Sequence, residues 1–130
     1  MSQLSDYFSD SELQCRATNI VELDINFERE LLLYRETLGF PLIVNSCCRS
    51  FAHNKKIGGS ETSYHIYEDV GDGRQGTLAI DLAVKNDKQR TEMVAVALNL
   101  GWSVGVYKSF IHIDRRVDIG KKQVCFWGKY

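Results

Sequence analysis

Several acidic and histidine residues, which can act in catalysis or bind metals, occur in segments where apolar residues are expected. Asp81 interrupts the apolar run of residues 78–84, which is typical of a buried strand. An unpaired carboxylate is costly to bury, so Asp81 needs a cation, hydrogen-bond donors or a metal as its partner. His112 and Asp114 are two positions apart in a second apolar segment, so both point to the same face of a strand. His65 follows a loop rich in glycine and serine.

Two histidines and one carboxylate are a ligand set for an open catalytic zinc site, in which three protein ligands leave a further position for water. The spacing alone also leaves simpler interpretations open. A histidine in a strand is often a hydrogen-bonded core residue. Asp81 can equally form an ion pair with Arg49 or Arg115, and Asp114 can orient His112 instead of handling protons.

The elements that must position these residues follow from periodicity and from turn signals. Apolar residues at helical spacing predict a helix over 26–38, ended by Gly39, and a second helix over 88–100 with Asp87 as its N-cap. Residues 47–64 have the composition of a loop. Strands are expected at 42–46, 77–84, 104–107, 110–114 and 124–127. We therefore expect one α+β domain over residues 1–130, with a mainly antiparallel sheet and flanking helices.

Composition narrows the class of protein. The formal net charge of −1 argues against a nucleic-acid partner held by a large basic face. No long apolar run predicts a membrane span, and the first residues lack the pattern of a secretory signal. We accordingly expect a monomer that is cytoplasmic as synthesised. The four cysteines are then expected to be reduced thiols.

A set of motifs in chain order resembles the M15 peptidases, the zinc D-Ala-D-Ala carboxypeptidases and peptidoglycan endopeptidases, and especially their small phage-type domains. The resemblance implies the hedgehog and D-Ala-D-Ala-peptidase type of fold. The matching segments are Phe8–Cys15, Gly39–Pro41, Asn45–Arg49, His53–His65, Ala79–Leu82 and Gly105–Arg116.

Carried over to this chain, the resemblance implies that His65, Asp81 and His112 bind Zn²⁺. Arg49 would bind a substrate carboxylate or the scissile carbonyl, and Ser63 would line the site or simply cap its loop. Asp114 would shuttle the proton or orient His112.

Two departures from the family pattern bear on these roles. His65 and Asp81 are 16 positions apart, more than is usual, and Asp72 stands at the usual offset, so Asp72 is the alternative ligand. Ser109 stands where some relatives carry the acid that serves as general base.

The function that the resemblance implies is zinc-dependent hydrolysis of peptide bonds in peptidoglycan stem peptides or cross-links. This would serve cell-wall lysis or remodelling, as in a phage lysin that reaches the wall after release or is carried by the virion. The alternative is a non-catalytic zinc-binding or peptidoglycan-binding module on the same fold. An unrelated interaction domain with accidental motif matches is a third interpretation.

Overall fold

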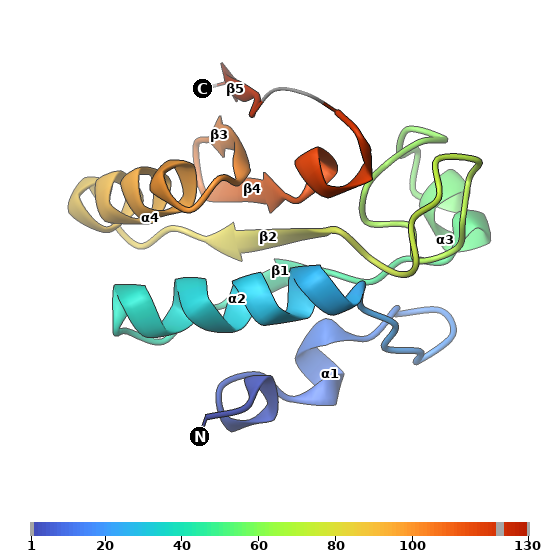
Figure 1. Ribbon diagram of the computed structural model, residues 1–130, viewed down its shortest axis with the longest axis horizontal. Helices are drawn as coiled ribbons and strands as arrows, with labels where there is room; N and C mark the ends of the chain where they lie inside the picture. The colour runs from blue at the N-terminus through green and yellow to red at the C-terminus, as the bar shows by residue number, and fades with distance from the viewer. Residues whose placement is uncertain (1, 122–123, 130) are drawn as a thin grey trace.

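One mixed sheet forms the centre of the protein (Figure 1). The computed structural model describes residues 2–121 and 124–129. The strand order is β1-β2-β4-β3-β5. The strands are β1 (Val44–Ser46), β2 (Ala79–Ala83), β3 (Ser103–Tyr107), β4 (Phe110–Asp114) and β5 (Phe126–Lys129). Strand β2 pairs antiparallel with β1 and β4, and β3 pairs antiparallel with β4, which confirms the predicted α+β class. Strand β5 pairs parallel to β3 at the edge of the sheet.

Two long helices have the predicted positions, and their ends follow from capping chemistry. Helix α2 (Ile25–Leu38) begins after Asp24, whose carboxylate accepts hydrogen bonds from two helix amides, and it ends at Gly39 with a φ of 75°. Helix α4 (Asp87–Asn99) begins after Asn86, which accepts from the amide of Gln89. The prediction that Asp87 caps this helix was therefore wrong by one position. In the described part of the chain, no helix is both long and apolar enough to cross a bilayer.

Four short elements complete the fold. They are η1 (Leu4–Asp6), α1 (Asp10–Leu13) and α3 (Phe51–Lys56), and a further 3-10 turn, η2 (Arg116–Ile119), follows β4. Helix α3 lies within the segment predicted to be a loop. Ser50 caps this helix by accepting a hydrogen bond from the amide of His53. An N-cap serine is a local helix signal, which the loop-like composition of the segment concealed. In Figure 1, α3 and the loops that follow it lie together at the end of the sheet where β2 begins.

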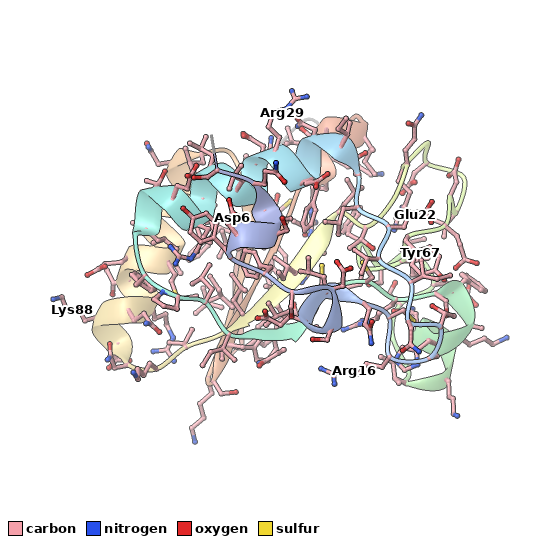
Figure 2. The ribbon with its side chains drawn as sticks, turned by 90° about the horizontal axis from the view of Figure 1, so that it is seen from below. Asp6, Arg16, Glu22, Arg29, Tyr67 and Lys88 are labelled. Carbon is pink, nitrogen blue, oxygen red and sulfur yellow. The ribbon has the colours of Figure 1, made fainter. Side chains whose placement is uncertain are left out.

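Helices α2 and α4 pack against each other and cover one face of the sheet with the main core (Figure 1). Phe27 and Tyr34 on α2 contact the buried ring of Trp102, with ring centroids 5.7 and 6.0 Å apart. The Tyr34 hydroxyl donates to the carbonyl oxygen of Met93 on α4, at 2.8 Å. Arg29 and Lys88 point outward from the two helices into solvent (Figure 2). This division between a buried and a charged side is that of amphipathic surface helices.

The central strands present two chemically different faces. Ile80 and Leu82 on β2 and Ile111 and Ile113 on β4 are fully buried in the core. Because side chains alternate along a strand, the residues between them project from the opposite face. On that face the alternation leaves Asp81, His112 and Asp114. The sheet therefore separates a hydrocarbon core from a polar site.

Candidate metal centre

Asp81 and His112 lie directly opposite each other in the antiparallel pair of β2 and β4. Their side chains share a face, as the alternation in the sequence predicts. His65 reaches the same place from the loop that precedes β2, and its side chain is 3% exposed. Ligand atoms of these three residues all lie within 4.8 Å of one another. Within residues 2–121 and 124–129 this is the one group of histidines, cysteines and carboxylates that meets a metal-ligand spacing.

His65 is held so that one ring nitrogen faces the carboxylate of Asp81. Its Nδ1 donates to the carbonyl oxygen of Cys47 at 2.7 Å, which places the proton of the neutral ring on Nδ1. Burial lowers the pKa of His65 below its ordinary value and so favours the neutral ring. Its buried Nε2 lies 3.2 Å from Asp81 Oδ1 without a hydrogen-bond geometry. A lone pair facing a carboxylate oxygen is unfavourable unless a cation lies between them, so this donor set fits a metal ion.

His112 stands between two carboxylates. Its Nδ1 lies 2.9 Å from Asp81 Oδ1, and its Nε2 lies 2.8 Å from Asp114 Oδ2. Burial lowers the pKa of His112, but the hydrogen bonds with Asp114 and Asp81 outweigh that effect and raise the pKa to about 9. Burial also raises the pKa of Asp81, yet its contacts with His112 and His65 hold that pKa well below the ordinary value. The site therefore concentrates negative charge between two imidazoles.

Asp114 is fully enclosed and already engaged on both oxygens. Its side chain is 0% exposed, and Arg116 donates to it from Nε at 2.9 Å, from a terminal nitrogen at 2.8 Å and from its backbone amide at 3.0 Å. The contact with His112 adds a further bond. A carboxylate with this set of partners orients an imidazole well, because neither oxygen is left over for water.

Arg49 lies beside the group on the β1 side of the sheet. Its guanidinium is 3.6 Å from Asp81 Oδ2 and is steadied by Ser46 Oγ at 3.1 Å and Asn54 Oδ1 at 3.2 Å. Its backbone amide donates to the carbonyl oxygen of His65 at 2.9 Å. The side chain is 17% exposed, so the cation stays reachable while it is held next to the histidines.

The other residues singled out in the sequence lie outside this group of potential metal ligands. Ser63 Oγ accepts from the amide of His65 at 3.3 Å, which caps the turn before that residue. His53 lies on α3, outside the group of potential metal ligands. Asp72 forms an ion pair with Arg74 at 2.6 Å and also lies outside the group. The geometry thus favours Asp81 over Asp72 as the carboxylate ligand.

Arg74 explains how the long segment between His65 and Asp81 is accommodated. Its side chain is 0% exposed. It donates to the carbonyl oxygens of Ser63, of Thr62 at 3.2 Å and of Ile66 at 3.0 Å, on both sides of His65. The extra residues therefore pack against the loop that carries His65 and are hydrogen-bonded to it through Arg74. We call this arrangement the Arg74 clasp. No repeat or motif in the sequence distinguishes Arg74, so sequence analysis missed it.

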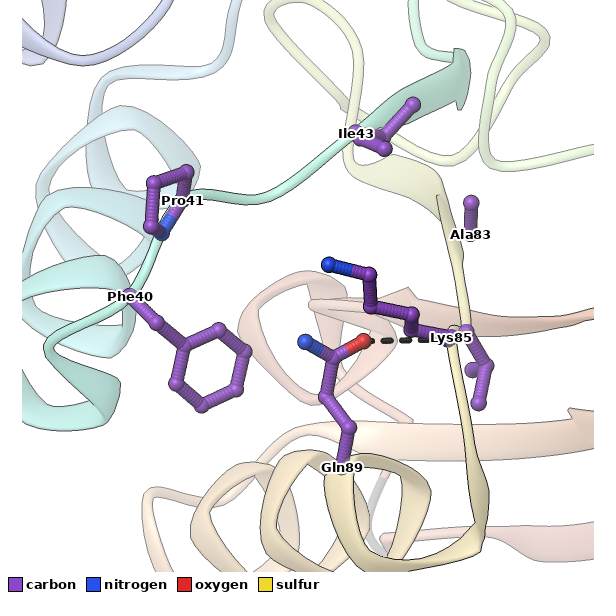
Figure 3. A pocket seen from close by; sticks show the side chains of 7 residues that line it. Phe40, Pro41, Ile43, Ala83, Lys85 and Gln89 are labelled. Atoms are coloured by element: carbon purple, nitrogen blue, oxygen red, sulfur yellow. Dashed lines mark hydrogen bonds between the residues drawn. The ribbon is translucent and has the colours of Figure 1, made fainter.

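A separate pocket of about 350 Å³ lies at the edge formed by β1 and β2, between Phe40 and Gln89 (Figure 3). The Gln89 side chain accepts there from the amide of Lys85 at 3.0 Å. The lining includes Pro41, Ile43 and Ala83 but neither a histidine nor a carboxylate. This pocket lacks the histidines and carboxylates of the group around Asp81, so that group is the candidate functional site.

A pair of imidazoles with one carboxylate, as on the polar face of this sheet, is a ligand set typical of the class of zinc hydrolases. Comparison with known families agrees. The Peptidase M15 family model matches residues 6–114, most of the chain, and the chain belongs to this family. M15 peptidases are zinc-dependent in general. A search among curated proteins finds no match.

Proposed function

We propose that this protein is a zinc peptidase that hydrolyses peptide bonds in peptidoglycan stem peptides or cross-links, with His65, Asp81 and His112 as its metal ligands. The observation that carries the proposal is the convergence of these three side chains, with ligand atoms within 4.8 Å, beside a half-buried arginine. A bound zinc ion supplies Lewis acidity, which polarises a carbonyl group and lowers the pKa of water.

The side chains of this chain have distinct roles in the proposal. Asp114 Oδ2 accepts the proton on His112 Nε2, which turns Nδ1 toward Asp81 and the metal position. The carbonyl oxygen of Cys47 does the same for His65 by accepting from Nδ1. Both imidazoles are therefore oriented before any ligand binds, which lowers the reorganisation that binding requires.

Arg49 is the proposed substrate anchor. A guanidinium offers paired donors that suit a carboxylate, and it also stabilises a carbonyl oxygen on which negative charge develops. Its bonds to Ser46 and Asn54 leave one terminal nitrogen with only the 3.6 Å contact to Asp81. We propose that this nitrogen meets the substrate. Ser63, which supports the backbone at His65, is proposed to line the same side of the site.

A non-catalytic zinc-binding or peptidoglycan-binding module on the same fold is the second candidate. The observation in its favour is the engagement of Asp114, whose oxygens are all used by His112 and Arg116. Ser109, three positions before His112, offers no carboxylate either. A general base is therefore the missing part of the catalytic proposal.

The test is metal content followed by activity. Elemental analysis of protein purified without chelator should give about one zinc per chain, and His112→Ala should lose it while remaining folded. His53→Ala is the matched control, because it removes a histidine outside the group and should keep the metal. Zinc together with release of peptide fragments from purified muropeptides would support the enzyme. Zinc without cleavage would support the binding module, and no zinc in the wild type would overturn both.

A further inference from the structure

Trp127 lies in the same cross-strand row as the candidate metal ligands Asp81 and His112, although the family match ends at residue 114. In this row Asp81 is opposite His112, His112 is opposite Gly105, and Gly105 is opposite Trp127. Directly opposed residues project from the same face of a sheet. The indole of Trp127 accordingly reaches the imidazole of His112, with ring centroids 5.5 Å apart.

Gly105 makes this approach possible. A Cβ at that position would lie 2.5 Å from Trp127 Cε2, so any other residue would push the indole away. The indole Nε1 donates to the hydroxyl of Tyr107 at 3.0 Å. The guanidinium of Arg116 stacks on the indole at 4.9 Å and on the ring of Tyr64 at 4.8 Å. Trp127 is thus held in one orientation while its side chain stays partly exposed.

Arg49 and Trp127 flank the metal ligands from opposite sides. Arg49 is bonded to Ser46, which pairs with Asp81 on the β1 side of the row, whereas Trp127 is at the β5 end. Consider a peptide whose carboxylate binds Arg49 and whose scissile bond lies at the histidines. The residue on the amino side of that bond then lies toward β5. That residue then meets an aromatic surface, which favours apolar groups.

We propose that Trp127 is a specificity-determining residue that packs against the side chain on the amino side of the scissile bond. The proposal rests on the peptidase function argued above. It selects substrates that carry an aliphatic side chain at that position over those that carry glycine. The residue acts by direct contact with substrate, and the described site is complete as a set of metal ligands without it.

The test compares two synthetic peptides that differ at one residue, one ending in D-Ala-D-Ala and one ending in Gly-D-Ala. For the wild type we expect kcat/KM to favour the first peptide by about fourfold, the effect of burying one methyl group. Trp127→Ala should bring that ratio close to one with its zinc content unchanged. Trp127→Phe should keep most of the preference. Phe126→Ala, an exposed neighbour whose side chain lies on the other face of the strand, should behave as the wild type.

The outcomes separate this inference from the proposed function. If Trp127→Ala lowers activity on both peptides equally, or changes neither, the specificity role is overturned. If the zinc-loaded wild type cleaves neither peptide, the peptidase function fails on these probes, and calorimetric binding of the same two peptides then decides the role of Trp127. A binding preference that disappears in Trp127→Ala would support the contact, and an unchanged or absent preference would refute it.

Discussion

Asp114 Oδ2 lies 2.8 Å from His112 Nε2, and the same carboxylate is gripped by Arg116 through two guanidinium nitrogens. The contacts from Arg116 through Asp114 to His112 lead to the candidate metal position. Asp114, in the middle of this chain of contacts, is 0% exposed, whereas Arg116 is partly exposed. This arrangement suits Asp114 to orient His112, a proposed metal ligand.

Asp114→Asn should weaken zinc binding by about 10–100-fold, the usual cost of removing a partner that orients a ligating histidine. The amide can present a donor where His112 Nε2 needs an acceptor, so the ring loses its fixed orientation. Competition with a chromophoric chelator measures the zinc affinity. Asp118→Asn is the matched control, because Asp118 pairs with Arg115 and Asn26 away from His112. A variant with normal affinity but lost turnover would instead favour the proton-shuttle role.

Asp81→Asn should lose zinc, whereas Asp72→Asn should retain about one equivalent. Asp81 Oδ1 lies 3.2 Å from His65 Nε2 and 2.9 Å from His112 Nδ1, while Asp72 is engaged by Arg74. Both substitutions remove one negative charge from the same region of the sequence, so they are closely matched. Elemental analysis after gel filtration provides the readout. Loss of the metal in the Asp72 variant alone would reverse the assignment.

Gly105→Ala should destabilise the fold by about 1–3 kcal/mol, the range for overpacking. The added methyl group would lie 2.5 Å from Trp127 Cε2, so the indole must move away from β3. Gly128→Ala is the control, since its Cβ would meet Val106 at an ordinary 3.6 Å. Thermal unfolding measures the stability, and a shift in tryptophan emission reports the displaced indole. Equal stabilities for the two variants would contradict the close approach.

Arg74→Ala should cost about 3 kcal/mol or more, because it leaves carbonyl oxygens around His65 unpaired and Asp72 without its cation. The side chain is 0% exposed and donates to the carbonyls of Ser63 and Ile66. Denaturant titration gives the free energy of unfolding. Arg90→Ala provides a comparison, since that arginine lies on α4 and contacts the carbonyl of Lys108. We expect zinc affinity to fall for Arg74→Ala only.

The contribution of Asp72 to the stability of the fold should be lost at acid pH. Hydrogen bonds from Arg74 lower the pKa of Asp72 below its ordinary value. A lowered pKa in the folded state means that the pair stabilises the protein above the ordinary aspartate pKa of about 3.9 and ceases to do so as pH falls through the folded pKa. The difference in Tm between the wild type and Asp72→Asn should therefore be constant near neutrality and should disappear as the pH falls below about 4. A difference that persists in acid would show that Asp72 acts through something other than its charge.

Much of the site follows from local rules that operate within one segment. Strand alternation places Asp81 on one face of its strand and His112 with Asp114 on one face of another, because successive side chains point to opposite sides. Capping chemistry likewise determines the ends of α2, with Asp24 at its start and Gly39 at its stop. The motif order predicted the M15 family, which the match over residues 6–114 confirms.

Other features depend on contacts between segments that are distant in the chain. Arg74 draws the extra residues into a clasp around His65, and so makes Asp81 rather than Asp72 the neighbour of the histidines. The final strand pairs parallel to β3, an exception in a sheet that was predicted to be, and is, mainly antiparallel.

Residue types and motif order thus predict the candidate ligands, the family and the faces on which Asp81 and His112 stand, since these depend on residues close together in the chain. The carboxylate next to His65, the partners of the Asp114 oxygens and the packing of Trp127 become apparent only in the folded protein. These features depend on strand pairing and on buried hydrogen bonds, whose partners no local pattern specifies.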